Sequence, residues 1–165
     1  MLTLMQINKA VDDTIESALH NTEFATVSVW AKDISEPIKR PSLKVAIGPS
    51  KNGRLNASYR EKTLTIRVYF FASNLKKYKI ENTKMQDILE SAFLDGVYVN
   101  GAYIPIETVE SDVTDTVLIC SFDLYIAELV ADKRTIDPET GEEINPETGD
   151  PIEIMETLEI EEEFS

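Results

Sequence analysis

The stretch "YREKTLTIRVYFFA", residues 59–72, has the clearest strand pattern in this 165-residue chain. Its apolar residues recur at every second position, at Leu64, Ile66, Val68 and Phe70. The residues between them are more polar: Thr65, Arg67 and Tyr69. A period of two places the two sets on opposite faces of a strand. One polar face is typical of an antiparallel sheet, because parallel sheets are covered on both faces.

The segment "TVLICSFDLYIAELV", residues 116–130, predicts the last long strand of that sheet. One face carries Leu118, Cys120, Phe122, Leu124 and Ile126. Val117 and Ile119 extend the apolar character to the other face, so we expect this strand to lie at the centre of the sheet, covered on both sides at one end.

Three further segments predict strands. One of them alternates at Leu43, Val45 and Ile47. The turn-rich "GPSKNGR" at 48–54 should end that strand. The segments "FATVSVWA" (24–31) and "TVESDV" (108–113) predict short strands. The intervening "DISEPIKRP" (33–41) is expected to be a loop, because its two prolines resist helix and central-strand pairing.

Two segments predict amphipathic helices that pack on the sheet. The first has an apolar stripe at Leu4, Ile7, Val11, Ile15, Ala18 and Leu19. Thr3 and Gln6 fit a capping box at its start, and we assign His20, the only histidine, a surface capping role in its last turn. The second should begin at Asn82 as N-cap and end at Leu94. Its stripe consists of Met85, Ile88, Leu89, Ala92 and Phe93.

The order of these elements decides the predicted fold class. The segment "VYVNGAYIPI" (97–106) predicts a hairpin, in which Asn100 and Gly101 suit a type I′ turn. Helices and strands do not alternate regularly, which favours α+β with a mostly antiparallel (mixed) sheet and two helices packed on it. We expect an α+β domain over residues 1–130 and an acidic C-terminal extension over 131–165.

Charge is distributed unevenly along the chain. Residues 131–165 hold 13 acidic and two basic residues, which gives −11 of the total −14. Residues 1–130 hold 17 acidic and 14 basic residues, which gives −3. A protein that binds in a DNA groove needs a basic face to displace counterions, so the balance argues against that class. The acidic extension is either a solvated tail or an arm that docks on a basic partner.

The extension contains a repeat, "DPETGEEINPETGDP", residues 137–151. Short Asp or Asn side chains, a proline and a glycine at matching positions predict two tight turns without a ligand. A calcium loop does not fit, because an EF-hand needs acids at alternate positions with glycine sixth and glutamate twelfth. Beyond the turns, Ile152 and Ile154 favour a strand, whereas Met155 and Leu158 favour a short helix. We interpret the segment as an arm ordered mainly by a partner, for example through strand addition.

No pattern in the chain predicts an enzyme. Cys120 lies in an apolar run and is expected to be a reduced core thiol, because reactive thiols prefer electropositive, partly exposed sites. A metal site would need more histidine or cysteine ligands than one of each. We therefore expect no catalytic residue, metal or cofactor. No signal peptide and no apolar run long enough to cross a bilayer is visible, so no membrane partner is expected.

Four segments carry a resemblance to a known family: "LTLMQINKAVDD", "DISEPIKRPSLKV", "YREKTLTIRVYFF" and "NGAYIPIETVESDVTDTVLICSFDLYI". Over residues 1–128 the chain resembles small phage and prophage proteins of Gram-positive hosts described as tail terminators. The resemblance implies a ring, usually of six copies, on the last ring of the tail tube. Such a ring ends tube growth, meets the connector of the neck, contacts the sheath in contractile tails and lets DNA pass through its centre.

A ring of identical subunits needs two different patches per subunit that meet head to tail. The candidate contact residues are Lys39, Arg40, Pro41, Lys51, Arg54, Arg60, Lys76, Lys77, Ile152 and Ile154. Each basic group among them is also compatible with ordinary solvated charges. The alternatives to a tail terminator are another neck or head–tail joining protein, and a small protein-binding module outside the virion.

Overall fold

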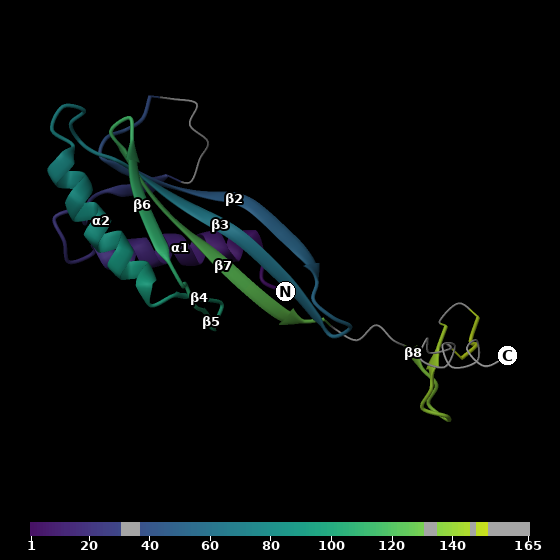
Figure 1. Ribbon diagram of the computed structural model, residues 1–165. Coiled ribbons are helices and arrows are strands. Elements are labelled where there is room, and N and C mark those ends of the chain that lie inside the picture. The colour runs from purple at the N-terminus through teal and green to yellow at the C-terminus, as the bar shows by residue number, and fades with distance from the viewer. Residues whose placement is uncertain (31–36, 131–134, 146–147, 152–165) are drawn as a thin grey trace. The chain divides into compact units, whose positions relative to one another are not determined.

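The computed structural model describes residues 1–30, 37–130, 135–145 and 148–151. The chain divides into two units, Met1–Leu129 and Val130–Ser165, which are described separately. The first unit is built on a five-stranded sheet with the order β1-β2-β3-β7-β6 (Figure 1). Its strands are β1 (Ser28–Trp30), β2 (Ser42–Arg54), β3 (Tyr59–Phe71), β6 (Val109–Thr114) and β7 (Val117–Leu129).

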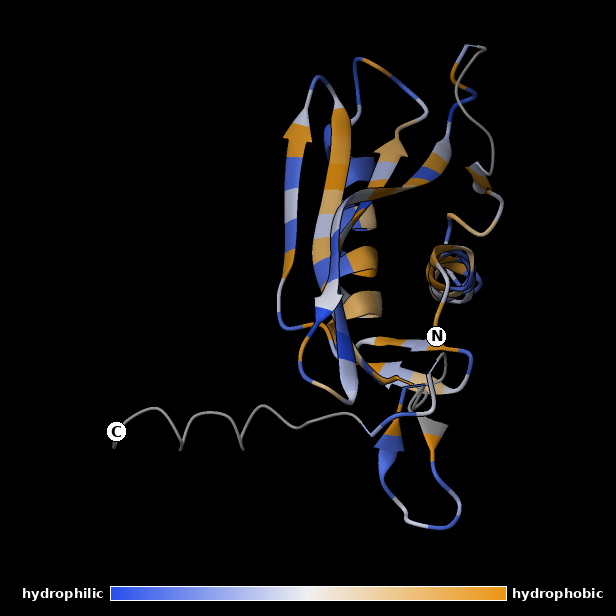
Figure 2. Ribbon diagram, turned by 90° about the vertical axis from the view of Figure 1, so that its right-hand side faces the viewer, coloured by the Kyte–Doolittle hydropathy of each residue, from blue (hydrophilic) through white to orange (hydrophobic). Residues whose placement is uncertain are grey.

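The sheet is antiparallel except at one edge, where β1 pairs with β2 in parallel. Strands β3 and β7 pair along their whole length, from Tyr59 opposite Leu129 to Phe70 opposite Leu118. The alternation in the sequence is visible along the strands in Figure 2. Strand β7 lies between β3 and β6, as predicted for a central strand. The predicted cover on its second face at Val117 and Ile119 is not provided by a described helix, because both helices pack on the other face, and these two side chains are half-buried.

Helices α1 (Leu4–Leu19) and α2 (Lys79–Leu94) cover one face of the sheet. The predicted capping box of α1 is confirmed: Thr3 Oγ1 accepts from the Gln6 amide at 3.2 Å, and Gln6 Oε1 accepts from the Thr3 amide at 2.9 Å. Exposed His20 is the C-cap residue of this helix. Neither helix in the described part of the chain is long and apolar enough to cross a membrane.

The core lies between the helices and the inner face of the sheet. It combines the predicted stripes of both helices with the apolar faces of β3 and β7, and Cys120 is buried in it as a free thiol. Two aromatic pairs join the layers: Phe24 with Phe70 at 5.8 Å between ring centroids, and Phe93 with Phe122 at 4.5 Å. Each such side chain contributes roughly 1.5–3 kcal/mol when it is fully buried. This arrangement confirms the predicted α+β class.

The start predicted for the second helix is wrong. Helix α2 begins at Lys79 with Tyr78 as N-cap, three residues before Asn82. Asn82 is buried, with only 3% of its surface exposed, and its side chain leaves the helix to bond the β6–β7 turn. A tertiary hydrogen bond therefore occupies the side chain that the sequence pattern assigned to a cap.

The turn predicted at residues 48–54 is also wrong. These residues continue β2, and the chain reverses at residues 55–58 instead. Gly48 and Pro49 together oppose Thr65, because the register moves from Ile47 opposite Ile66 to Ser50 opposite Leu64. A bulge of this kind accommodates turn-forming residues inside a strand that a long partner holds in place. Within the described part of the strand predicted over 24–31, residues 24–30, only Ser28–Trp30 pair with β2.

A small hairpin closes one end of the helical layer. Strands β4 (Val97–Val99) and β5 (Ala102–Ile104) are joined at Asn100 and Gly101, whose φ values of 50° and 82° confirm the predicted turn. Gly96, with φ of 87°, precedes the hairpin. A Cβ atom there would lie 2.5 Å from the Ile104 carbonyl oxygen and 2.8 Å from the Tyr103 ring, so only glycine fits.

In the second unit, β8 (Thr135–Ile136) pairs with β9 (Glu143–Ile144). The same backbone hydrogen bond recurs in the two copies of the repeat. The Gly141 amide donates to the Asp137 carbonyl oxygen at 2.9 Å, and the Gly149 amide donates to the Asn145 carbonyl oxygen at 2.7 Å. Both glycines have positive φ, 72° and 76°. The segment from residue 152 onward, for which strand and helix were both open, lies outside the described residues.

Candidate protein interface

The face of the sheet opposite the helices is a candidate interface, because no described helix packs on it. We call it the outer face. Its residues are Lys44, Ala46 and Lys51 of β2, Glu61, Thr63, Thr65, Arg67 and Tyr69 of β3, Ile119, Ser121, Asp123 and Tyr125 of β7, and Glu110 and Asp112 of β6. Most of these side chains are exposed or half-buried, so the strand alternation presents a broad polar surface.

The charges of the outer face are separated by strand. Basic side chains lie on β2 and β3: Lys44, Lys51 and Arg67. Acidic side chains lie on β6 and β7: Glu110, Asp112 and Asp123. The exception is Glu61 at the far end of β3, which accepts a hydrogen bond from the Tyr125 hydroxyl at 3.1 Å.

These charges are not neutralised within the described residues. The two ion pairs found there are Lys9–Asp13 on α1 and Lys84–Glu23 beside α2, both away from the outer face. Asp123 accepts a hydrogen bond from the Thr65 hydroxyl at 2.6 Å, which fixes its carboxylate without neutralising it. The Arg67 guanidinium lies over Gly48 of β2, where a Cβ atom would be 3.3 Å from its Nη1. It therefore leans toward the basic strands.

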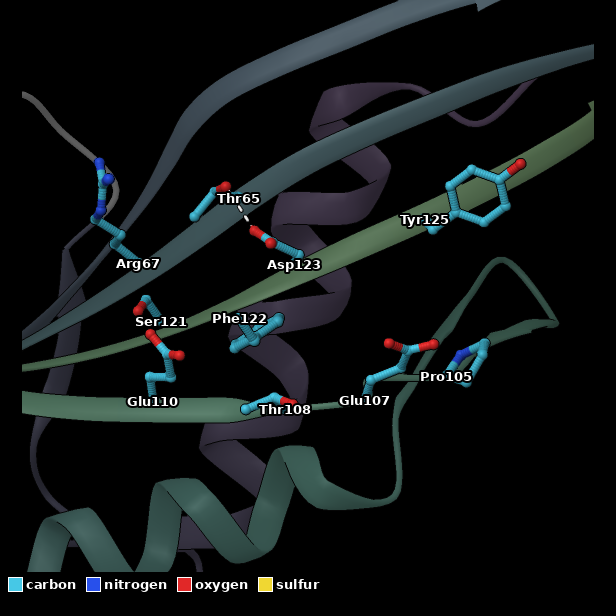
Figure 3. Close-up of a pocket in the computed structure, with 10 residues that line it drawn as sticks. All are labelled: Thr65, Arg67, Pro105, Glu107, Thr108, Glu110, Ser121, Phe122, Asp123 and Tyr125. Carbon is cyan, nitrogen blue, oxygen red and sulfur yellow. Dashed lines mark hydrogen bonds between the residues drawn. The ribbon is translucent and has the colours of Figure 1, made fainter. Parts of the chain in front are cut away.

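A hollow of about 680 Å³ lies on the acidic half of the outer face (Figure 3). Its lining includes the carboxylates of Glu107, Glu110 and Asp123, with Arg67 at one side. Three carboxylates against one guanidinium give the hollow an acidic character. Such a surface favours a basic protein group over an anionic ligand.

The chemistry of the described residues offers no reacting group at this face. Cys120 is buried beneath it, and burial raises the pKa of its thiol to about 11, so the thiol is protonated at neutral pH. Among residues 1–30, 37–130, 135–145 and 148–151, no group of three or more His, Cys, Asp or Glu side chains is placed to hold a metal ion.

A second exposed surface surrounds the β4–β5 hairpin. Tyr98 and Tyr103 face each other across it with ring centroids 5.1 Å apart, and they are 70% and 51% exposed. The Tyr103 hydroxyl donates to the Asp95 carbonyl oxygen at 2.5 Å, which holds that ring in place. Met1 and Tyr125 line a neighbouring groove with Tyr103. Exposed, positioned aromatic rings are typical of protein contact surfaces.

Of the predicted contact residues, the group Lys39, Arg40 and Pro41 immediately precedes β2. Arg40 is half-buried: its guanidinium carbon lies 5.7 Å from the centre of the Phe71 ring, and its Nη1 donates to the Ala72 carbonyl oxygen at 3.1 Å. Lys39 is exposed and Pro41 is half-buried. Within this group, only Lys39 presents a free charge to solvent.

Lys51, Arg54 and Arg60 are exposed on the β2–β3 hairpin. Arg54 and Arg60 occupy directly opposed positions, and no described carboxylate forms an ion pair with either. Like charges directly opposite each other destabilise a strand pair, so this end of the hairpin favours an anionic neighbour.

Lys76 and Lys77 are exposed in the loop before α2, where their amides donate to Asn74 Oδ1. This loop follows the end of β3, whereas Arg60 lies at the beginning of β3. The structure thus separates the predicted basic residues into groups at opposite ends of β3, along about 40 Å of strand. Ile152 and Ile154 lie outside the described residues.

The charged residues of the outer face were not predicted as a site from the sequence. The alternation in the sequence placed Arg67 on the polar face of its strand, and that was the only signal in the sequence for a site there. Glu110 and Asp123 come from segments 43 or more residues away, and only the pairing of β6 with β7 and of β7 with β3 places them beside Arg67.

Comparison with known proteins shows which family the chain belongs to. No curated protein matches it significantly. A family model described as "Phage tail terminator protein" matches residues 6–136, which include the whole five-stranded sheet and both helices except the first two residues of α1. The match covers well over half of the chain, and it ends before the repeated turns. The chain therefore belongs to the phage tail terminator family, a family of structural virion proteins.

Proposed function

We propose that this protein ends the growth of a phage tail by forming a ring of six copies on the last ring of the tail tube. The family match over residues 6–136 carries this proposal. The ring then joins the tail to the connector of the neck and, in a contractile tail, meets the top of the sheath. Assembly takes place in the host cytoplasm, and the completed ring stays at the tail–neck junction of the virion.

The charge of the chain supports a role as a passage for DNA. Six copies would carry 6 × −14 = −84. An anionic lumen keeps DNA mobile, because its surface offers no Lys or Arg contacts to hold the phosphates. We infer that the lumen is lined by acidic side chains. A ring with a basic lumen would contradict this part of the proposal.

Contacts that build the ring are proposed to include the exposed basic residues Lys39, Lys51, Arg54, Arg60, Lys76 and Lys77. Arg54 and Arg60 are favoured, because they face each other without a described carboxylate partner. The acidic extension is proposed to act as an arm, with Ile152 and Ile154 as its contact residues.

A reconstitution with purified tail tubes tests the proposed function. Tube protein should polymerise without limit on its own, and addition of this protein should stop elongation and leave a ring at one tube end in electron micrographs. Bovine serum albumin at the same concentration is the control. Unchanged elongation with no ring on any tube would exclude the proposed function. Binding to isolated heads or connectors without tube binding would indicate a neck protein instead.

A further inference from the structure

We propose that the outer face is the contact between neighbouring copies of this chain, with the acidic half of one copy against the basic half of the next. The acidic half is Glu110, Asp112 and Asp123, and the basic half is Lys44, Lys51 and Arg67. This inference rests on the proposed function, since it assigns the surface through which the ring closes.

The outer face carries complementary charges on its two halves. Opposite charges on the same surface would normally form ion pairs with each other, yet none is present there among the described residues. Arg67 lies over Gly48, on the side of its strand that faces away from Asp123. Two separated halves of opposite sign are the arrangement that attracts a second copy.

The two halves of the outer face also differ in shape. The hollow of about 680 Å³ lies on the acidic half, where Glu107, Glu110 and Asp123 line it. Lys51, an exposed side chain of the basic half, lies on β2, and no residue of β2 lines this hollow. In a ring each copy would use one half for each neighbour, whereas use of both halves in a single contact would give a two-fold pair, and subunit counting on tail tubes distinguishes the two.

Among the described residues, no helix packs on the outer face. Both helices and the apolar core lie on the opposite side of the sheet. Asp123 is held by Thr65 at 2.6 Å, so its carboxylate has a fixed position before any partner arrives. A preordered charge loses little conformational freedom on binding.

Charge reversal tests the proposal, because its two halves are predicted to rescue each other. The basic-half variant carries Lys51→Glu and Arg67→Glu, and the acidic-half variant carries Glu110→Lys and Asp123→Lys. Each variant alone brings like charges together, so its self-association should weaken by roughly tenfold or more. An equimolar mixture of the two variants restores opposite charges at every contact and should associate like the unaltered protein.

A matched control separates this effect from net charge. Lys79→Glu with Lys84→Glu changes the total charge by the same amount as the basic-half variant, on exposed positions of α2. This control should associate normally. Full-length proteins are compared by sedimentation velocity over a concentration series and by subunit counting on tail tubes, and circular dichroism checks that each variant is folded.

The inference would be overturned if both variants assembled normally, if the mixture failed to recover, or if the unaltered protein did not self-associate either free or on tubes. Loss in the basic-half variant alone would also overturn it, and would indicate another acidic surface, such as residues 131–165, on the basic half. If both charge-reversal variants still formed rings that cap tubes, the inference would fail but the proposed function would stand. If the unaltered protein did not cap tubes, the proposed function itself would be contradicted.

Discussion

The side-chain nitrogen Nδ2 of Asn82 donates a hydrogen bond to the carbonyl oxygen of Thr116 at 3.0 Å. This contact joins α2 to the tight turn between β6 and β7, in which Asp115 and Thr116 have φ of 49° and 72°. Non-glycine residues adopt such values at a cost, so the turn depends on contacts that hold it. Asn82 is therefore a link between the helical layer and the acidic edge of the sheet.

Replacement of Asn82 should destabilise the fold. Asn82→Ala leaves the Thr116 carbonyl without its donor, and we expect a loss of about 1–3 kcal/mol in the free energy of unfolding. Asn82→Asp should cost more at neutral pH, because a carboxylate would then face a carbonyl oxygen. Urea denaturation measures both.

The control for Asn82 is Asn8→Ala on α1, where Asn8 Nδ2 donates to Asp12 Oδ2 at 3.1 Å one helical turn away. Such pairs stabilise a helix by roughly 0.2–0.5 kcal/mol, so this change should have a small effect. Equal losses for Asn8→Ala and Asn82→Ala would show that the link to Thr116 has no special role.

Gly96→Ala should destabilise the protein far more than the same change at Gly101. Both glycines have positive φ, 87° and 82°, which strains an alanine by about 1–2 kcal/mol. A Cβ atom at Gly101 meets nothing within 4 Å, whereas at Gly96 it would overlap the Ile104 carbonyl oxygen and the Tyr103 ring. We expect roughly 2–3 kcal/mol of additional loss at Gly96. Thermal or urea unfolding of the two variants gives the difference, and similar values for both would contradict the overlap.

Cys120 should make the stability depend on pH in the alkaline range. Burial raises the pKa of its thiol from 9.0 to about 11, so above pH 9 the unfolded chain releases a proton that the folded chain keeps. The free energy of unfolding should therefore fall as pH rises from about 9 toward 11. Cys120→Ala removes this titration, and the difference between the two proteins isolates it from lysine and tyrosine. A pH-independent difference would contradict the assignment.

The same burial predicts the reactivity of the thiol. A thiol reagent such as DTNB should leave Cys120 unmodified in the native protein at pH 8 and label it fully in guanidinium chloride, because the side chain is completely buried. Rapid labelling of the folded protein would show that the core opens at β7.

A chain that ends at Val130 should keep the stability of the full-length protein. The described residues of the hydrophobic core run from Ile7 to Ile126, so none of them is removed with residues 131–165. We expect the urea midpoint to change by less than the equivalent of about 0.5 kcal/mol. A larger loss would show that the second unit packs on the first.

The same truncation tests the proposed arm. If the acidic extension binds a basic surface of a neighbouring copy, its removal should weaken ring assembly more at low salt than at high salt, because screening already reduces the attraction at high salt. Assembly that is equal with and without the extension at every salt concentration would contradict a role for the arm in the ring.

Much of the fold could be predicted from local patterns because those patterns have local causes. Alternation of period two decided which side of β3 and β7 faces the core. The positive φ values available to Asn100 and Gly101 decided the hairpin, and the reciprocal bonds of Thr3 and Gln6 decided where α1 begins. In each case the interacting groups are close in the chain, so their spacing alone carries the information.

The mistaken predictions have tertiary causes. Residues 48–54 are turn formers by composition, but they pair with β3 and so continue β2. The bulge at Gly48 and Pro49 accommodates the extra residue in this pairing. Asn82 is a good capping residue, but its distant partner Thr116 keeps it inside the helix. The charged halves of the outer face could not be predicted from the sequence for the same reason. Arg67, Asp123 and Glu110 become neighbours only through strand pairing.

By itself, the sequence determined the α+β class, the buried faces of its long strands and helices, and the uneven charge of the chain, because hydrophobic periodicity and composition do not depend on a distant partner. The tertiary structure alone decided which charged side chains share a surface and which backbone groups need a distant donor. Those relationships depend on the order and register of strands, and pairing of long strands overrides the preference of any short segment.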